Sequence, residues 1–142
     1  MEPADLRTST RPFLLTARFF ALATVAVVVV LFGTAGALVQ LGELKDVHGS
    51  AAIALHVVTG GLTVALAGLA YSRQRGWWAA VVAAVIFAFS FLQAALGEGT
   101  TLRLHVPGSL LIVAGTVWLT VWLLSPAAAD ATATRGPVKR DP

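Results

Sequence analysis

Apolar residues dominate four long blocks of the chain, and short polar segments separate these blocks. The blocks lie at about residues 19–41, 48–71, 77–97 and 104–124. A membrane-spanning helix needs about 20 mostly apolar residues, and each block is long enough to supply them. Even the valine-rich run at residues 27–30 suits a helix in lipid, where the backbone must satisfy its hydrogen bonds internally. The pattern therefore predicts four transmembrane helices.

The segments that join the blocks are short and lie at residues 42–47, 72–76 and 98–103. Short connections place consecutive helices side by side and antiparallel. We therefore expect an all-α fold, an integral membrane four-helix bundle with up-down topology. Residues 1–18 and 126–142 are expected to form tails around a transmembrane domain at residues 19–125. The second tail is rich in Ala, Thr, Pro and charge, and is expected to be disordered.

Composition supports a membrane protein and narrows its chemistry. Hydrophobic residues make up 57% of the chain and charged residues 12%, against roughly 25% charged residues in an ordinary soluble domain. The absence of cysteine excludes disulfides, thiolate metal sites, iron–sulfur clusters and c-type haem attachment. The net charge of +3 does not indicate nucleic-acid binding, because the basic residues flank the apolar blocks.

The distribution of basic residues predicts the orientation in the membrane. Lys45 and Arg103 alone lie in the first and third connections, and the positive-inside rule places the opposite side in the cytoplasm. We therefore expect a multi-pass protein of the cell membrane with both termini cytoplasmic. The other eight basic residues lie in the tails and the middle connection: Arg7, Arg11, Arg18, Arg73, Arg75, Arg135, Lys139 and Arg140.

A short internal repeat divides the expected bundle into two halves. The order Leu-Gly-Glu, a spacer, His, then Gly-Ser occurs at residues 41–50 and again at residues 96–109. This order predicts two copies of a helical hairpin, related by an axis along the membrane normal. The repeat would place His48 and His105 at one depth near the outer face, on the second and fourth helices.

The three histidines, His48, His56 and His105, are the candidate functional residues. An ionisable residue within a membrane is a hypothesis of function by default. The alternative is a neutral imidazole that bonds a neighbouring helix, worth about 0.6 kcal/mol. A four-helix bundle can hold b-type haem between two axial histidines on facing helices. His48 and His105 suit this role because the repeat gives them equal depth.

His56 lies about 12 Å deeper than His48 if the segment between them is helical. It would replace His48 as a ligand if the second helix began later than expected. Otherwise it would reach a ring substituent of the haem or bond a carbonyl group. The glycines at residues 49, 60, 61 and 108 are open to two interpretations, as space for a flat macrocycle or as close helix packing.

Polar residues near the outer face leave further alternatives. Glu43, Asp46 and Glu98 are either solvated charges or carboxylates that support the histidine rings. Imidazole and carboxylate together would also suit a Cu or Zn site made by His48, His105, Glu43 and Glu98. Gln40 and Gln93 are expected to form hydrogen bonds between helices.

Several short motifs resemble a known family. The segments 46–49 (Asp-Val-His-Gly), 71–73 (Tyr-Ser-Arg), 93–97 (Gln-Ala-Ala-Leu-Gly) and 104–105 (Leu-His) are similar to one half of haem A synthase. They also resemble small four-helix membrane proteins of actinobacteria that have no assigned function. The likeness to haem A synthase implies a four-helix bundle with axial ligands at His48 and His105.

The chain departs from that family in several ways. It has one half instead of two, and no cysteine pair. Lys45 and Gly49 stand where the family has an acidic residue and an arginine. The likeness therefore extends to haem binding and not to the oxidation chemistry.

The expected function is accordingly that of a membrane protein that binds haem b, for electron transfer or haem handling at the outer face. We assign no catalytic residue. The alternative is a non-catalytic accessory subunit of a larger respiratory or other membrane complex. The small size of the chain and its plain first and third helices fit such a subunit.

The charge distribution gives a direct test of orientation. A reporter protein fused after Pro142 should be active if it requires the cytoplasm, because eight of ten basic residues lie on that side. The measurement is a paired fusion to one reporter that works inside the cell and one that works outside. Activity of the external reporter would reverse the orientation and the side of every histidine.

Overall fold

The protein is built from four long helices. The computed structural model describes residues 3–97, 99–126 and 128. Each long helix is apolar enough to cross a membrane, which confirms the predicted four spans, and the described residues contain no strand. The elements are α1 (Pro3–Leu41), α2 (Lys45–Arg73), α3 (Trp77–Ala95), the short 3-10 helix η1 (Gly99–Thr101) and α4 (Leu102–Leu124).

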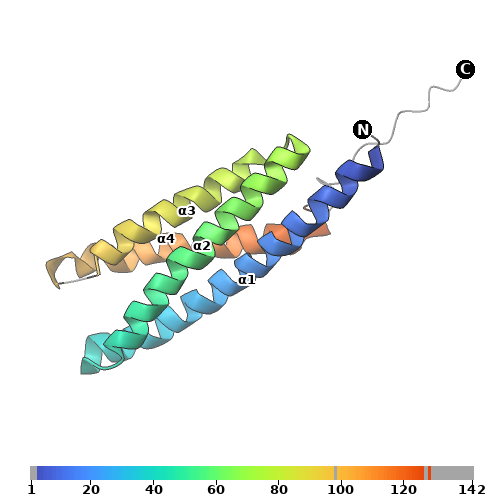
Figure 1. The fold of residues 1–142 in the computed structure, drawn as a ribbon. Helices are drawn as coiled ribbons and strands as arrows, with labels where there is room; N and C mark the ends of the chain where they lie inside the picture. The colour runs from blue at the N-terminus through green and yellow to red at the C-terminus, as the bar shows by residue number, and fades with distance from the viewer. Residues whose placement is uncertain (1–2, 98, 127, 129–142) are drawn as a thin grey trace, which may run out of the picture.

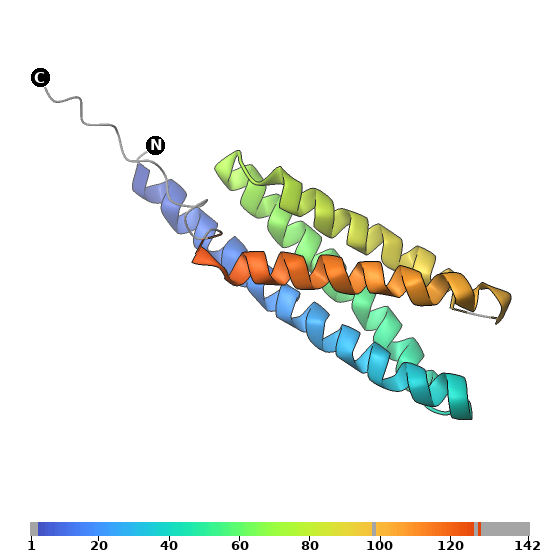
Figure 2. The ribbon, with the colours of Figure 1, turned by 180° about the vertical axis from the view of Figure 1, so that it is seen from behind.

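The helices are arranged in a ring in chain order. α1 packs against α2 and α4, and α3 also packs against α2 and α4, whereas the backbones of the diagonal pairs are not in contact. The α1–α2 and α3–α4 connections lie at one end of the bundle, and the α2–α3 connection lies at the other (Figures 1 and 2). We call these the outer and inner ends, after the expected orientation. The up-down topology predicted from the short connections is confirmed.

The first helix is longer than the hydropathy pattern predicts. We expected a tail at residues 1–18, but α1 begins at Pro3 instead of near Phe19. Part of this extension belongs to the bundle, because Ala17 is fully buried and the Phe13 ring lies over α2. The expected C-terminal tail, residues 126–142, falls outside the described residues except for residues 126 and 128.

Phenylalanines of α1 lie in notches made by glycines of α2. A Cβ atom on Gly61 would come within 2.5 Å of the Phe20 ring, and one on Gly68 would overlap the Phe13 ring. Phe13 and Phe20 are seven residues apart, and so are Gly61 and Gly68. A seven-residue spacing keeps contacts on one face of a helix pair. These two contacts therefore determine the antiparallel register of α1 and α2.

The second hairpin repeats this packing with different side chains. The Gln93 side chain lies over Gly108, and a Cβ atom on Gly115 would come within 3.0 Å of Ile86. Again both pairs are seven residues apart. In each hairpin, the first helix supplies the large side chain and the second helix supplies the glycine. Small residues at the interface let helices approach closely, which drives association in lipid.

The interior changes in character along the bundle. The inner half holds an apolar cluster from all four helices, and a further apolar layer, Val28, Leu55, Ile86 and Ile112, lies beyond it. Outward of this layer, no buried residue of the described chain is a large apolar side chain. The buried residues there are Thr34, Ala51, Ser90, Gln93 and Gly108.

The glycine notches predict that an alanine in place of a notch glycine destabilises the hairpin. Gly61→Ala should lower the free energy of unfolding by about 1–3 kcal/mol, because the added Cβ forces the Phe20 ring out of its notch. The matched control is Gly36→Ala on α1, where nothing lies within 4 Å of the added atom. Unfolding of both variants by SDS in mixed micelles measures the difference. Equal stability of the two variants would contradict the notch as the source of register.

Candidate functional site

His48 lies at the start of α2 and is bound to α1. Its Nδ1 lies 2.9 Å from Oγ1 of Thr34. The Thr34 hydroxyl also lies 2.9 Å from the carbonyl oxygen of Val30, to which only the hydroxyl can donate. Because that donation uses the hydroxyl proton, the Thr34 oxygen accepts from His48, and Nδ1 carries the proton. In the neutral ring the other nitrogen, Nε2, then keeps its lone pair.

The notch register explains why Thr34 meets His48. Thr34 lies two seven-residue steps beyond Phe20 along α1, on the face that packs against α2. Thr34 is buried and His48 is half-buried. The glycine contacts toward the inner end thus align a hydrogen-bond partner for the imidazole at the outer end.

His105 lies at the start of α4 and is bound to α3. Its Nδ1 donates to the backbone carbonyl of Gln93 at 2.8 Å, and a carbonyl can only accept. In return, Nε2 of the Gln93 side chain donates to the backbone carbonyl of His105 at 3.2 Å. Gln93 is buried over Gly108, which sets its position. In the neutral ring, Nε2 of His105 likewise keeps its lone pair.

The two imidazoles hold equivalent places in the two hairpins. Each is the fourth residue of its helix, and each donates through Nδ1 to the first helix of its own hairpin. Both lie at the outer end, at the starts of α2 and α4. Neither Nε2 has a hydrogen-bond partner among the described residues. The pairing of the two histidines in one site, which the repeat predicts, stays a prediction.

His56 belongs to a different interface. Its Nδ1 lies 2.8 Å from Oγ of Ser90, and Ser90 donates its own proton to the carbonyl of Phe87 at 2.6 Å. The His56 ring stacks on Phe91, with centroids 4.0 Å apart and planes 8° from parallel. These contacts connect α2 to α3. His56 lies two helical turns deeper than His48, and the structure does not bring it to the outer pair.

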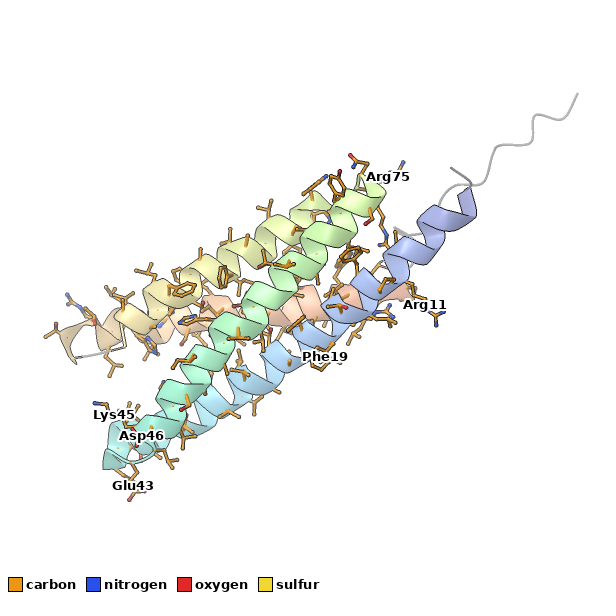
Figure 3. The ribbon with its side chains drawn as sticks, viewed as in Figure 1. Arg11, Phe19, Glu43, Lys45, Asp46 and Arg75 are labelled. Carbon is orange, nitrogen blue, oxygen red and sulfur yellow. The ribbon has the colours of Figure 1, made fainter. Side chains whose placement is uncertain are left out.

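Carboxylates do not complete a metal site at the outer end. Glu43 and Asp46 are exposed, and Figure 3 shows Glu43 directed away from the helices. Glu98 lies outside the described residues. No group of three or more His, Cys, Asp or Glu side chains in the described chain could hold a metal ion. Two imidazoles alone suit a metal that brings its other ligands with it, as haem iron does.

The glycines considered as space for a macrocycle have mostly another role. Gly61 and Gly108 are filled by Phe20 and Gln93, and a Cβ atom on Gly60 would come within 3.2 Å of Phe87. Their interpretation as close packing sites is therefore confirmed. Gly49 differs, because nothing lies within 4 Å of an added Cβ there.

The sequence did not indicate Thr34 and Ser90, the two hydroxyl partners of the histidines. Threonine and serine are common in membrane helices and usually bond their own backbone, as Thr24 does to Phe20. A signal was nevertheless present, because the seven-residue spacing of Phe13, Phe20 and Thr34 places all three on one face. Gln93 was expected to bond between helices and does so, whereas Gln40 is exposed.

Comparisons with known proteins do not identify a family or a function for this chain. No family model, no curated protein and no solved structure matches the sequence. The likeness to one half of haem A synthase stays a prediction from short motifs. The hydrogen bonds of His48 and His105 are therefore the main indication of function.

The hydrogen bonds predict the protonation of each imidazole. Proton–nitrogen NMR correlation spectra should show a proton on Nδ1 of all three histidines. Thr34→Val removes the acceptor of His48 and should change its spectrum alone. His105 is the internal control, because its acceptor is a backbone carbonyl that the substitution leaves in place. Protonation on Nε2 in the unaltered protein would refute this assignment.

Proposed function

We propose that this chain is a membrane protein that binds b-type haem at its outer end, with His48 and His105 as the axial ligands. Its role would be electron transfer or haem handling. The observation that carries the proposal is the state of the two imidazoles. Each donates a hydrogen bond from Nδ1 to a neighbouring helix. In the neutral ring, the lone pair on Nε2 is then free of any described partner. A histidine that binds a metal has this arrangement.

The placement of the ligands also suits a flat group between two hairpins. His48 and His105 lie on α2 and α4, which are diagonal in the ring and whose backbones are not in contact. A haem with two axial histidines requires such separation, because the iron and two imidazoles must fit between the backbones. The pair also occupies the end of the bundle where buried residues are polar or small. A flat macrocycle would fill the space between the hairpins there and supply van der Waals contacts.

Each supporting residue has a defined part in this proposal. Thr34 orients the His48 ring, and the Gln93 carbonyl orients the His105 ring. Both bonds raise the basicity of the ligand nitrogen and limit rotation of the ring. His56 stays an interhelical contact with Ser90 and Phe91. Bound haem would supply a one-electron redox centre. The protein would then bind and orient the haem, and no catalytic side chain would be required.

The proposed ligands can be tested by absorption spectroscopy. The full-length protein, expressed with haem supplied and purified in detergent, should show the spectrum of a low-spin haem with two histidine ligands. His48→Gln and His105→Gln should each abolish that spectrum, because glutamine can still donate a hydrogen bond but is a poor ligand for haem iron. Thr34→Val should weaken haem affinity by about tenfold while keeping both ligands.

His56→Gln is the matched control, since it makes the same change in another buried imidazole. It should retain the low-spin spectrum. Loss of the spectrum in His56→Gln together with its retention in His48→Gln would move the ligand role to His56. An unaltered protein without haem would refute the proposal and leave the histidines as interhelical contacts, as expected of an accessory subunit.

A further inference from the structure

A second polar site lies at the inner end, far from the histidines. A pocket of about 200 Å³ opens between α2, α3 and α4. Arg73 and Arg75 line it on one side, and Trp78 and Trp122 line it on another. Leu66 and Leu69 form part of its apolar wall. The pocket thus combines two cations with an apolar lining at the end of membrane-spanning helices.

No carboxylate whose side chain the structure describes forms an ion pair with Arg73. Its Nε is buried and has no hydrogen-bond partner. The carboxylates whose side chains the structure describes, Glu43 and Asp46, lie at the outer end, opposite Arg75 (Figure 3). A buried donor without a partner costs about 1–3 kcal/mol, and more for a charged group. The pocket therefore favours an anion as its occupant.

The turn between α2 and α3 holds the arginines in place. The backbone amide of Arg75 donates to the carbonyl of Ala70 at 3.2 Å, and that of Gln74 donates to Tyr71 at 3.3 Å. This is the Schellman pattern of a helix end, with Gln74 in the left-handed conformation at φ 52°. The tight turn places Arg73 and Arg75 on either side of one residue. Both can therefore serve the same pocket.

Aromatic side chains identify the surroundings of the pocket. The Trp78 ring meets Trp122 edge to face at 4.7 Å and lies 5.3 Å from Trp118. Tryptophan gathers where membrane helices cross the level of the lipid headgroups. The pocket consequently lies at headgroup depth, where the anions present at high local concentration are lipid phosphates.

We propose that this pocket binds the phosphodiester group of an anionic phospholipid from the leaflet at the inner end. Arg73 and Arg75 would bind the phosphate, and the leucine wall would contact the adjoining apolar part of the lipid. Basic pockets between membrane helices on the cytoplasmic side commonly bind anionic headgroups. A soluble phosphate offers the same charge but leaves the apolar wall without a partner. The site is independent of haem binding at the outer end.

Native tryptophans make the proposal measurable. The full-length protein is reconstituted in vesicles that contain brominated phosphatidylglycerol or brominated phosphatidylcholine at the same fraction, and bromine quenches tryptophan on contact. Phosphatidylglycerol should quench more strongly, through Trp78 and Trp122 in the pocket wall. Arg73→Gln should lower the preference for phosphatidylglycerol about fivefold, the amount expected for one cation near the membrane surface.

Arg75→Gln is a second variant that carries the test if Arg73→Gln fails to fold, because Arg75 is exposed beyond the helix end. Arg11→Gln is the matched control, since Arg11 is exposed at the same end but outside the pocket (Figure 3). If Arg11→Gln loses as much preference for phosphatidylglycerol as Arg73→Gln does, general surface charge explains the preference, and the proposed site is overturned. Equal quenching by the two lipids in the unaltered protein would also overturn it. If inorganic phosphate displaces brominated phosphatidylglycerol as effectively as unbrominated phosphatidylglycerol does, the pocket binds a soluble anion instead of a lipid.

Discussion

The structure depends on large side chains of one helix that lie in glycine notches of the next. Inside a bilayer, lipid tails are as apolar as leucine, so burial of apolar surface does not hold helices together. Shape complementarity must do so. In this chain the notches recur every seven residues on α2 and on α4, and α1 and α3 fill them with Phe20 and Gln93. Rotation and register of each hairpin follow from these contacts.

The notches also connect the packing to the candidate site. An imidazole at the outer end finds an acceptor only if the partner helix presents a polar atom at the right rotation. Phe13 and Phe20 establish that rotation for α1, which brings Thr34 to His48. In the second hairpin one residue has both tasks, since Gln93 fills the notch and its backbone accepts from His105. The site geometry is therefore a product of close packing elsewhere in the bundle.

The fold could be read from the sequence because the membrane leaves few choices. Four apolar blocks with short connections permit little besides an up-down bundle. The repeat also indicated that His48 and His105 hold equivalent positions, each the fourth residue of its helix. Hydropathy could not locate the start of α1, because it marks where lipid begins and not where a helix begins. It also could not identify Thr34 or Ser90 as partners of the histidines. Such pairs depend on helix rotation, which follows from steric contacts that no hydropathy scale contains.

The two ends of the bundle use opposite means of cohesion. The inner half has an apolar cluster from all four helices and an aromatic group around Trp78. The outer third has directed hydrogen bonds between small and polar residues, with the α1–α2 and α3–α4 connections held in separate hairpins (Figures 1 and 2). Cohesion at the inner end is therefore non-directional, whereas cohesion at the outer end depends on the rotation of individual side chains.

The proton on Nδ1 of each histidine restricts how charge can move through this protein. A residue in a proton relay must exchange protons between its two ring nitrogens during every cycle. In His48, a move of the proton to Nε2 would require the Thr34 hydroxyl to turn away from the Val30 carbonyl and donate to Nδ1 instead. In His105, the same move would leave the Gln93 carbonyl without its donor, because a carbonyl cannot reverse the bond. A shift of the proton within the ring is therefore less costly in the first hairpin than in the second.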